Sequence, residues 1–209
     1  MTLAHLMKSE GYNLHLLSYN YGQRHKKELE FAKKCAERLD AQWTLVDLSG
    51  IQLLLAGSAL TSDEVAVPEG HYSAESMKAT VVPNRNSIML AIAWGHAVSI
   101  GAEVVCIGVH AGDHTIYPDC RPEFIELFER TENVANEGFG AMHLEAPFLY
   151  KNKADIVKIG SKLGVPYAET WSCYVGKDIH CARCGTCVER IEAFYLANVT
   201  DPTVYERGF

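Results

Sequence analysis

Hydrophobic positions along the chain alternate between short continuous runs and helical repeats. Apolar runs at 13–19 and 42–48 flank the segment 26–39, whose apolar residues recur about every three to four positions. Continuous apolar runs are typical of parallel strands covered on both faces, and strands joined through one helix are typical of βαβ units. The pattern therefore predicts a strand–helix–strand unit near the start of the chain, with its first strand buried.

The same alternation continues to the end of the chain. A helix is predicted around Leu3–Met7, ending at Gly11, and a short helix is predicted at 51–56. Further predicted helices cover 86–100, 122–137, 153–163 and a last segment ending near Ala197, and further predicted strands cover 103–109 and 142–148. Strands and helices in alternation predict an α/β fold with a doubly wound, Rossmann-like parallel sheet.

Ligands of such sheets bind at the carboxyl ends of the strands. We therefore expect the ligand-binding segments to be 20–25, 83–86 and 110–121. The segment 58–82 is polar, contains Pro and Gly, and has no period. Loops of this length are often lids or binding loops, and the sequence leaves the role of this one open.

Composition excludes some classes of protein. The chain has 209 residues and a net charge of −7 with no long basic block, which argues against a nucleic-acid partner. No apolar stretch approaches the roughly 18 residues of a membrane span, and the first residues do not resemble a secretory signal. We therefore expect a cytoplasmic protein with reduced thiols and no membrane partner.

Four of the seven cysteines cluster late in the chain. Their spacing of seven, two and two intervening residues predicts a closed, structural zinc site with these ligands: Cys173, Cys181, Cys184 and Cys187. Redox-active thiols, an iron–sulfur cluster and replacement of one ligand by His180 are the alternatives. Cys35 and Cys106 lie in apolar patterns and are predicted to be core residues. We expect a nucleotide-binding-type domain at 1–165 and a zinc-binding segment at 166–209.

Three polar runs lie in the expected binding segments. YGQRH at 21–25 follows the first predicted strand, and its simplest interpretation is a solvated helix entry. VPNRN at 82–86 is interpreted either as a turn with Asn86 as helix N-cap, or as a loop in which Arg85 directs its donors at an anion. GVHAGDHTIYPDCR at 108–121 follows a predicted strand, and its acids, Arg and aromatic residue favour a function over packing.

Taken in order, these motifs resemble a known family. YGQRH, VPxRN, GDxxxYPDCR, Lys153-Ala-Asp and SCY followed by CxxCxxC resemble the 7-cyano-7-deazaguanine synthases of the queuosine pathway, over nearly the whole chain. Those enzymes belong to the PP-loop, or N-type ATP pyrophosphatase, superfamily. The resemblance implies an ATP-dependent ligase that converts 7-carboxy-7-deazaguanine and ammonia into the nitrile, with zinc, magnesium and a homodimeric assembly. In that reaction a nucleotidyl group activates the carboxylate, ammonia gives an amide, and a second activation removes water.

The resemblance also implies roles for residues that contact the nucleotide and its phosphates. Ser18 and Tyr19, at the end of the first predicted strand, would lie beside the adenine. Gly108, at another strand end, would let the nucleotide approach closely. Arg85 and Lys153 would neutralise phosphate or carboxylate charge during catalysis.

Further roles implied by the resemblance fall on the run at 108–121. Asp113 would assist magnesium or orient ammonia in catalysis. Asp119 would accept hydrogen bonds from the guanine-like N–H edge, and Arg121 would pair with the substrate carboxylate. Tyr117 would complete the substrate-binding site.

One motif of the family is missing from the sequence. The SGGxDS loop, which binds the ATP phosphates through glycine amides and a helix N-terminus, does not occur, and residues 1–6 resemble the helix that would follow it. We expect the chain as written not to hydrolyse ATP, because it lacks this loop. The loop is missing either because the chain is written from an internal Met or because it is a genuine short form. Two other functions remain open, namely another PP-loop ligase or amidating enzyme, and a non-catalytic, zinc-stapled binding module.

Overall fold

The computed structural model shows an α/β protein with parallel strands, which confirms the predicted fold class. The residues that it describes are 1–55, 57–62, 65–70, 78–175 and 178–206. The chain divides into two compact units. Unit 1 comprises Met1–Val82 and Lys153–Phe209, and unit 2 comprises Pro83–Asn152. The division at 165 and 166 into a nucleotide-binding and a zinc-binding part stays a prediction.

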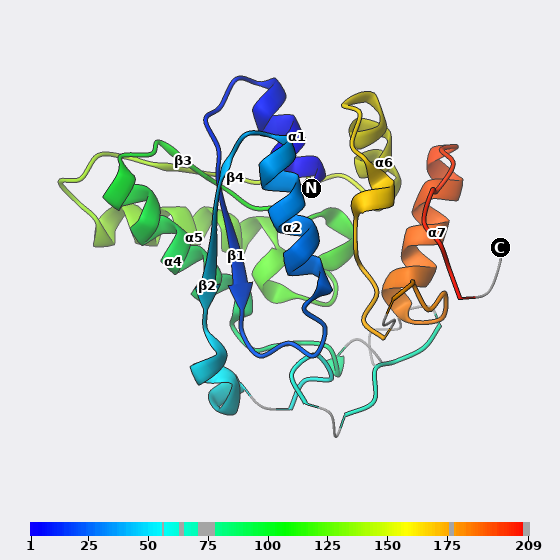
Figure 1. The fold of residues 1–209 in the computed structure, drawn as a ribbon. Helices are drawn as coiled ribbons and strands as arrows, with labels where there is room; N and C mark the ends of the chain where they lie inside the picture. Colours follow the sequence, from blue (N-terminus) through cyan, green and yellow to red (C-terminus); the bar gives the residue numbers. More distant parts are fainter. Residues whose placement is uncertain (56, 63–64, 71–77, 176–177, 207–209) are drawn as a thin grey trace. The chain divides into compact units, whose positions relative to one another are not determined.

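Unit 1 contains the strand–helix–strand arrangement predicted for its first half. Strand β1 (His15–Asn20) pairs in parallel with β2 (Gln42–Asp47), and α2 (Lys27–Arg38) connects them. Figure 1 shows the two strands side by side with α2 next to them. Helix α2 packs against both strands, and it buries Cys35 and Ala36 on its apolar face.

The predicted burial of the first strand is wrong. Every residue of β1 is half-buried, and β2 is largely exposed, with Leu45 retaining 43% of its accessible surface. Successive side chains of a strand point to opposite faces, so half of the positions in each strand point away from α2. The apolar run at 13–19 therefore indicates strand propensity and does not indicate complete burial.

The rest of unit 1 is built on three further helices. Helix α6 (Lys153–Lys162) packs against both α1 (Thr2–Ser9) and α7 (Gly185–Ala197) (Figure 1). The core between α6 and α7 contains Ala154, Val157, Ala193, Phe194 and Ala197. A 3-10 turn, η4 (Tyr167–Glu169), completes this core. The Tyr167 ring packs edge-on against Phe194, with centroids 4.8 Å apart.

Unit 2 surrounds a second parallel strand pair. Strand β3 (Val104–Cys106) pairs with β4 (His143–Glu145), and helices α4 (Arg85–Ile100) and α5 (Pro122–Ala135) complete the unit. The core of unit 2 is centred on the fully buried Trp94.

Both strands of unit 2 are shorter than predicted. Pairing ends at Ile107, whose N–H donates to the Glu145 carbonyl oxygen at 2.9 Å. On the β4 side, Pro147 has no N–H to continue the ladder, and a turn follows in which the Leu149 N–H donates to Ala146. Hydrophobicity alone does not reveal where the ladder stops.

The segment after β2 is only partly described. A 3-10 helix, η1 (Ser49–Leu55), replaces the short helix predicted at 51–56, and residue 56 lies outside the described part. In the loop predicted at 58–82, residues 63–64 and 71–77 also lie outside it. Its described residues Ala59 and Leu60 are buried, so this portion is packed into unit 1. Along the described ranges, no helix is long and apolar enough to cross a membrane.

Candidate functional site

The four late cysteines form a buried cluster in unit 1. Their sulfur atoms lie within 4.8 Å of one another, with 3.9 Å between Cys173 and Cys184 and 4.0 Å between Cys181 and Cys187. A tetrahedral zinc ion with Zn–S bonds of about 2.3 Å holds its sulfurs about 3.8 Å apart. The cluster therefore fits one metal ion bound by four thiolates.

Backbone donors surround the sulfur atoms. The N–H groups of Val175 and Cys181 each donate to the Cys173 sulfur at 3.4 Å, and the Cys184 N–H donates to the Cys181 sulfur at 3.3 Å. The Thr186 hydroxyl lies 3.3 Å from the Cys184 sulfur. Such outer contacts orient ligands and stabilise thiolate charge.

His180 does not replace a cysteine in this cluster. Its ring is buried and accepts a hydrogen bond from the Ser172 N–H at 3.4 Å, and its centroid lies 4.3 Å from that of Trp171. Among the described residues, the four cysteines are the only group that could hold a metal ion. Four protein ligands leave no position for a substrate, so the site is suited to a structural role.

Trp171 ties the metal cluster to α2. Its indole N–H donates to the Cys173 carbonyl oxygen at 3.0 Å, and its ring stacks on Phe31 with centroids 6.1 Å apart. The Lys27 ammonium lies 4.3 Å from the Trp171 ring centroid and donates to the Asp178 carbonyl oxygen at 2.7 Å. The metal cluster and the helix after β1 are thus joined by several contacts.

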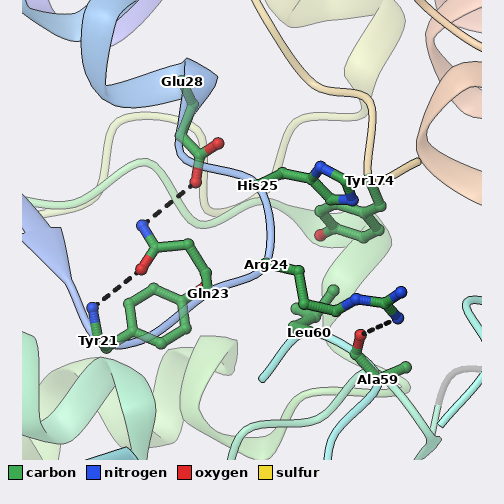
Figure 2. A pocket seen from close by; sticks show the side chains of 8 residues that line it. All are labelled: Tyr21, Gln23, Arg24, His25, Glu28, Ala59, Leu60 and Tyr174. Atoms are coloured by element: carbon green, nitrogen blue, oxygen red, sulfur yellow. Dashed lines mark hydrogen bonds between the residues drawn. The ribbon is translucent and has the colours of Figure 1, made fainter. Parts of the chain in front are cut away.

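A small pocket lies directly after β1, where the YGQRH run leaves the strand. Figure 2 shows its lining, which consists of Tyr21, Gln23, Arg24, His25, Glu28, Ala59, Leu60 and Tyr174. Its volume is about 30 Å³. Tyr174 comes from the SCY run of the metal segment, so two distant motifs of the sequence meet here.

Gln23 fixes the shape of this loop. It is 5% exposed, and its amide nitrogen donates to the Tyr19 carbonyl oxygen at 3.0 Å and to a Glu28 carboxylate oxygen at 3.4 Å. Its amide oxygen accepts from the Tyr21 N–H at 2.9 Å. Burial raises the pKa of Glu28. The buried Gln23 therefore sets the conformation of 21–25.

Arg24 extends from the same loop to the segment at 58–65. Its guanidinium donates to the carbonyl oxygens of Ala59 at 3.4 Å and Val65 at 3.2 Å. Its backbone N–H donates to the Leu60 carbonyl oxygen at 2.9 Å. Arg24 thereby holds the far wall of the pocket in place (Figure 2).

In unit 2, Asp119 accepts a backbone hydrogen bond at the N-terminus of α4. A carboxylate oxygen of Asp119 accepts the Asn86 N–H at 3.1 Å, and the Asn86 amide nitrogen donates to the Asp119 carbonyl oxygen at 3.2 Å and lies 3.3 Å from the Cys120 sulfur. The interpretation of Asn86 as the N-cap is wrong, because Asn84 occupies that position. Asp119 supplies from a distant turn the acceptor that an N-cap side chain normally provides.

Other predicted site residues gather around Cys120. Burial raises the pKa of the Cys120 thiol to about 12, the charges of Asp113 and Asp119 reinforce the shift, and Arg85 opposes it. Asp113 also lies 3.3 Å from the His110 imidazole, counted between a carboxylate oxygen and Nε2. Unit 2 therefore brings together Arg85, Asp113 and Asp119.

The remaining residues of the 108–121 run occupy its outer part. The side chain of the exposed Arg121 donates from Nε to the His114 carbonyl oxygen at 2.8 Å. The Tyr117 N–H donates to the Asp113 carbonyl oxygen at 2.9 Å, and Gly108 is exposed just after β3. These backbone contacts shape a loop of 3-10 turns, η2 (Ala111–Asp113) and η3 (Pro118–Cys120).

Three predicted site residues belong to unit 1. The Ser18 hydroxyl accepts from the Trp43 indole N–H at 3.0 Å, and burial raises the pKa of Tyr19 to about 12. The Lys153 ammonium, at the start of α6, forms an ion pair with Glu189 of α7. The charge of Lys153 is therefore paired within unit 1.

Fold and site together define an α/β protein with a closed four-cysteine metal centre and charged loops after its parallel strands. The model of one protein family, Queuosine biosynthesis protein QueC, matches residues 1–198, and the chain belongs to this family.

The sequences of curated relatives are similar to this chain along almost its whole length. The 7-cyano-7-deazaguanine synthase of Rhizobium johnstonii is 57% identical over 206 residues, which are 99% of this chain and 87% of the relative. Synthases of the same name from Rhizobium etli and Brucella anthropi are each 56% identical, again over 99% of this chain and over 87% and 88% of those proteins.

Sequence reasoning gave no site role to several residues that the structure singles out. Gln23, Glu28 and Tyr174 line the pocket after β1, Asn86 donates to Asp119, and Cys120 lies beside Asn86. The available signal was the YGQRH run followed by a glutamate. Because Tyr174 reaches the pocket from a different part of the chain, no local spacing predicts its contribution.

Proposed function

We propose that this chain is a 7-cyano-7-deazaguanine synthase. It uses ATP to convert 7-carboxy-7-deazaguanine and ammonia into 7-cyano-7-deazaguanine, a step of queuosine biosynthesis. The observation that carries the proposal is the 57% identity to a synthase of this name over 99% of the chain. The four-cysteine cluster and the charged loop of unit 2 support it independently.

The chemistry requires activation of a carboxylate. Its oxygen is a poor leaving group until a nucleotidyl group is attached, after which ammonia displaces that group and forms an amide. A second activation of the amide oxygen allows loss of water and leaves the nitrile. Charge builds on phosphate and carbonyl oxygens in both stages, and we assign Arg85 and Lys153 to neutralise it.

Substrate recognition is assigned to the loop of unit 2. Asp119 is proposed to accept hydrogen bonds from the guanine-like edge, and the bond from the Asn86 N–H supports this role because it fixes the carboxylate in place. Arg121 is proposed to pair with the substrate carboxylate, as its exposed position permits. Tyr117 is assigned to the same binding site.

ATP and magnesium are proposed as the other small molecules of the reaction. Ser18 and Tyr19 would contact the adenine, and Gly108 would admit the nucleotide backbone. Asp113 offers a carboxylate of the kind that magnesium prefers. The sequence contains no SGGxDS run, and we propose that ATP chemistry needs such a phosphate loop.

The metal in the four-cysteine cluster is proposed to be zinc with a structural role. All seven cysteines are unbridged, which suits a reducing compartment, and we propose the cytoplasm as the location. A homodimer without nucleic-acid partners is proposed as the working form.

Substitution of Lys153 and Arg121 tests the proposed roles. The protein to use is the chain with an SGGxDS phosphate loop added ahead of Met1, because the proposal requires such a loop for ATP chemistry. Lys153→Ala and Arg121→Ala are each expected to lower kcat/KM for nitrile formation by about 100-fold or more, because each removes a charge that offsets charge in the transition state. Product is measured by mass spectrometry.

The matched controls replace exposed cations of the two helices that begin at or just after the tested residues. They are Lys158→Ala on α6 and Arg130→Ala on α5. Both are expected to retain activity. Nitrile formation at the parental rate in Lys153→Ala or Arg121→Ala would show that the corresponding assignment is wrong.

A further inference from the structure

The pocket after β1 is large enough for only a very small molecule. Its volume of about 30 Å³ suits one molecule of the size of water and is too small to enclose a nucleotide or a purine-like base. Buried Ala59 and Leu60 form one wall, and the 21–25 loop with Tyr174 forms the others (Figure 2).

Glu28 is the acidic residue of this lining. One of its carboxylate oxygens accepts from the Gln23 amide nitrogen at 3.4 Å, and Gln23 is held by two further hydrogen bonds to the backbone of Tyr19 and Tyr21. The Arg24 guanidinium donates to the Ala59 and Val65 carbonyl oxygens. Burial raises the pKa of Glu28, and a small cation beside the carboxylate would offset that cost.

We propose that this pocket binds the nitrogen substrate, as the ammonium ion, with the Glu28 carboxylate as its counter-ion. The inference rests on the proposed function, which requires ammonia. Ammonium has the size of water and only donates hydrogen bonds, so it matches a small cavity with a carboxylate acceptor. The pocket lies at the carboxyl end of β1, the end of a parallel strand at which α/β proteins bind their ligands.

Steady-state kinetics with ammonium chloride test the role of Glu28. In the protein that carries the phosphate loop, Glu28→Gln is expected to raise the KM for ammonium about tenfold or more, and to leave the KM values for ATP and 7-carboxy-7-deazaguanine within about twofold. Glutamine keeps an oxygen that accepts from Gln23, so the loop should keep its shape. Glu30→Gln, at an exposed position of the same helix, is the matched control and should change none of these values. An unchanged KM for ammonium in Glu28→Gln would overturn the proposal.

Methylamine tests the size of the pocket. The parental enzyme is expected to reject it, whereas Leu60→Ala removes a buried wall side chain and should admit it. The bound methylammonium would first lose a proton to water, and its free nitrogen would then bond to the activated carboxyl carbon. The bond from that carbon to the nucleotidyl oxygen would break, the nucleotide would leave with the electron pair, and the nitrogen would lose a second proton to water. The product would stop at the N-methyl amide, because it keeps too few N–H protons to lose water and give a neutral nitrile. Equal use of methylamine by the parental enzyme would contradict a pocket of this size.

A binding measurement separates this proposal from the proposed function. Line broadening of ¹⁵N-labelled ammonium in NMR spectra should appear on addition of the chain and disappear with Glu28→Gln, whether or not nitrile forms. Broadening that depends on Glu28 without nitrile formation would retain the pocket and reject the synthase. Nitrile formation with broadening equal in both proteins would retain the synthase and reject the pocket.

Discussion

At the scale of single residues, buried charged side chains have the largest effect on the stability of the fold. Arg190 and Asp201 have side-chain exposures of 10% and 12%, and they are joined by two hydrogen bonds of 3.1 and 3.0 Å. The Tyr205 hydroxyl donates to the same carboxylate at 2.6 Å. This pair fastens the end of the chain to α7, whereas the ion pair between Arg38 and Glu169 is largely exposed.

The Arg190–Asp201 pair predicts acid-sensitive stability. Burial alone would raise the pKa of Asp201, but hydrogen bonds from Arg190 and Tyr205 hold it below its usual value. A lowered pKa in the folded state stabilises the protein above the unfolded pKa of about 3.9, and this contribution is lost as the pH falls through the folded pKa. The deficit of Asp201→Asn relative to the parent should therefore be full at neutral pH and shrink below about pH 4.

Urea unfolding between neutral and acidic pH measures this effect. Arg190→Ala is expected to lower the free energy of unfolding by about 3–5 kcal/mol at neutral pH, because it leaves a buried carboxylate without its partner. Arg38→Ala is the matched control on an exposed pair and should cost much less. Equal losses for the two variants, or a deficit of Asp201→Asn that is independent of pH, would contradict this account.

At the scale of secondary-structure elements, the metal cluster links segments that would otherwise be held weakly. The Glu69 carboxylate accepts from the Arg183 guanidinium at 2.9 Å, and the Gly70 N–H donates to the Arg183 carbonyl oxygen at 2.8 Å. Trp171 connects the cluster to α2 on another side. Metal binding should therefore stabilise α2 and residues 65–70 together with the cysteines.

Metal removal should destabilise the protein. The account predicts a single tightly bound zinc per chain, and chelation is expected to lower the Tm by about 10 °C or more, because metal-binding free energy contributes to folding. Trp171 fluorescence should change at the same time, since its indole N–H bonds to Cys173. Elemental analysis and calorimetry make the measurement.

Cysteine substitutions provide the matched comparison. Cys184→Ser should lose zinc and reproduce the low Tm, whereas Cys106→Ser, at a half-buried position outside the cluster, should retain zinc. Bound iron in place of zinc, or an unchanged Tm after complete chelation, would contradict a structural zinc site.

Local elements were predictable where one physical signal dominates. The helical period of α2 and the cysteine spacing each depend on neighbouring residues, and both predictions agree with the structure. The lengths of β3 and β4 were not predictable, because they depend on which backbone groups find partners. The N-terminus of α4 was misassigned because its acceptor, Asp119, is distant in sequence. The pocket with Glu28 and Tyr174 escaped prediction for the same reason.

At the scale of the whole molecule, the residues assigned to the reaction are distributed over both compact units. Unit 1 carries Ser18, Tyr19, Lys153 and the metal cluster, and unit 2 carries the loop with Asp113 and Asp119. Sequence motifs suggested these residues in order along the chain, and the family model matches residues 1–198. The central claim is the proposed ATP-dependent formation of the nitrile.

Incorporation of labelled nitrogen tests this claim most directly. The zinc-loaded protein with its phosphate loop is incubated with ATP, magnesium, 7-carboxy-7-deazaguanine and ¹⁵N-ammonium, and the products are identified by mass spectrometry. The account predicts 7-cyano-7-deazaguanine that carries the label, formed only when ATP is present, with the labelled amide as its precursor. Unchanged substrate in a folded, zinc-loaded protein, or a nitrile without the label, would contradict it.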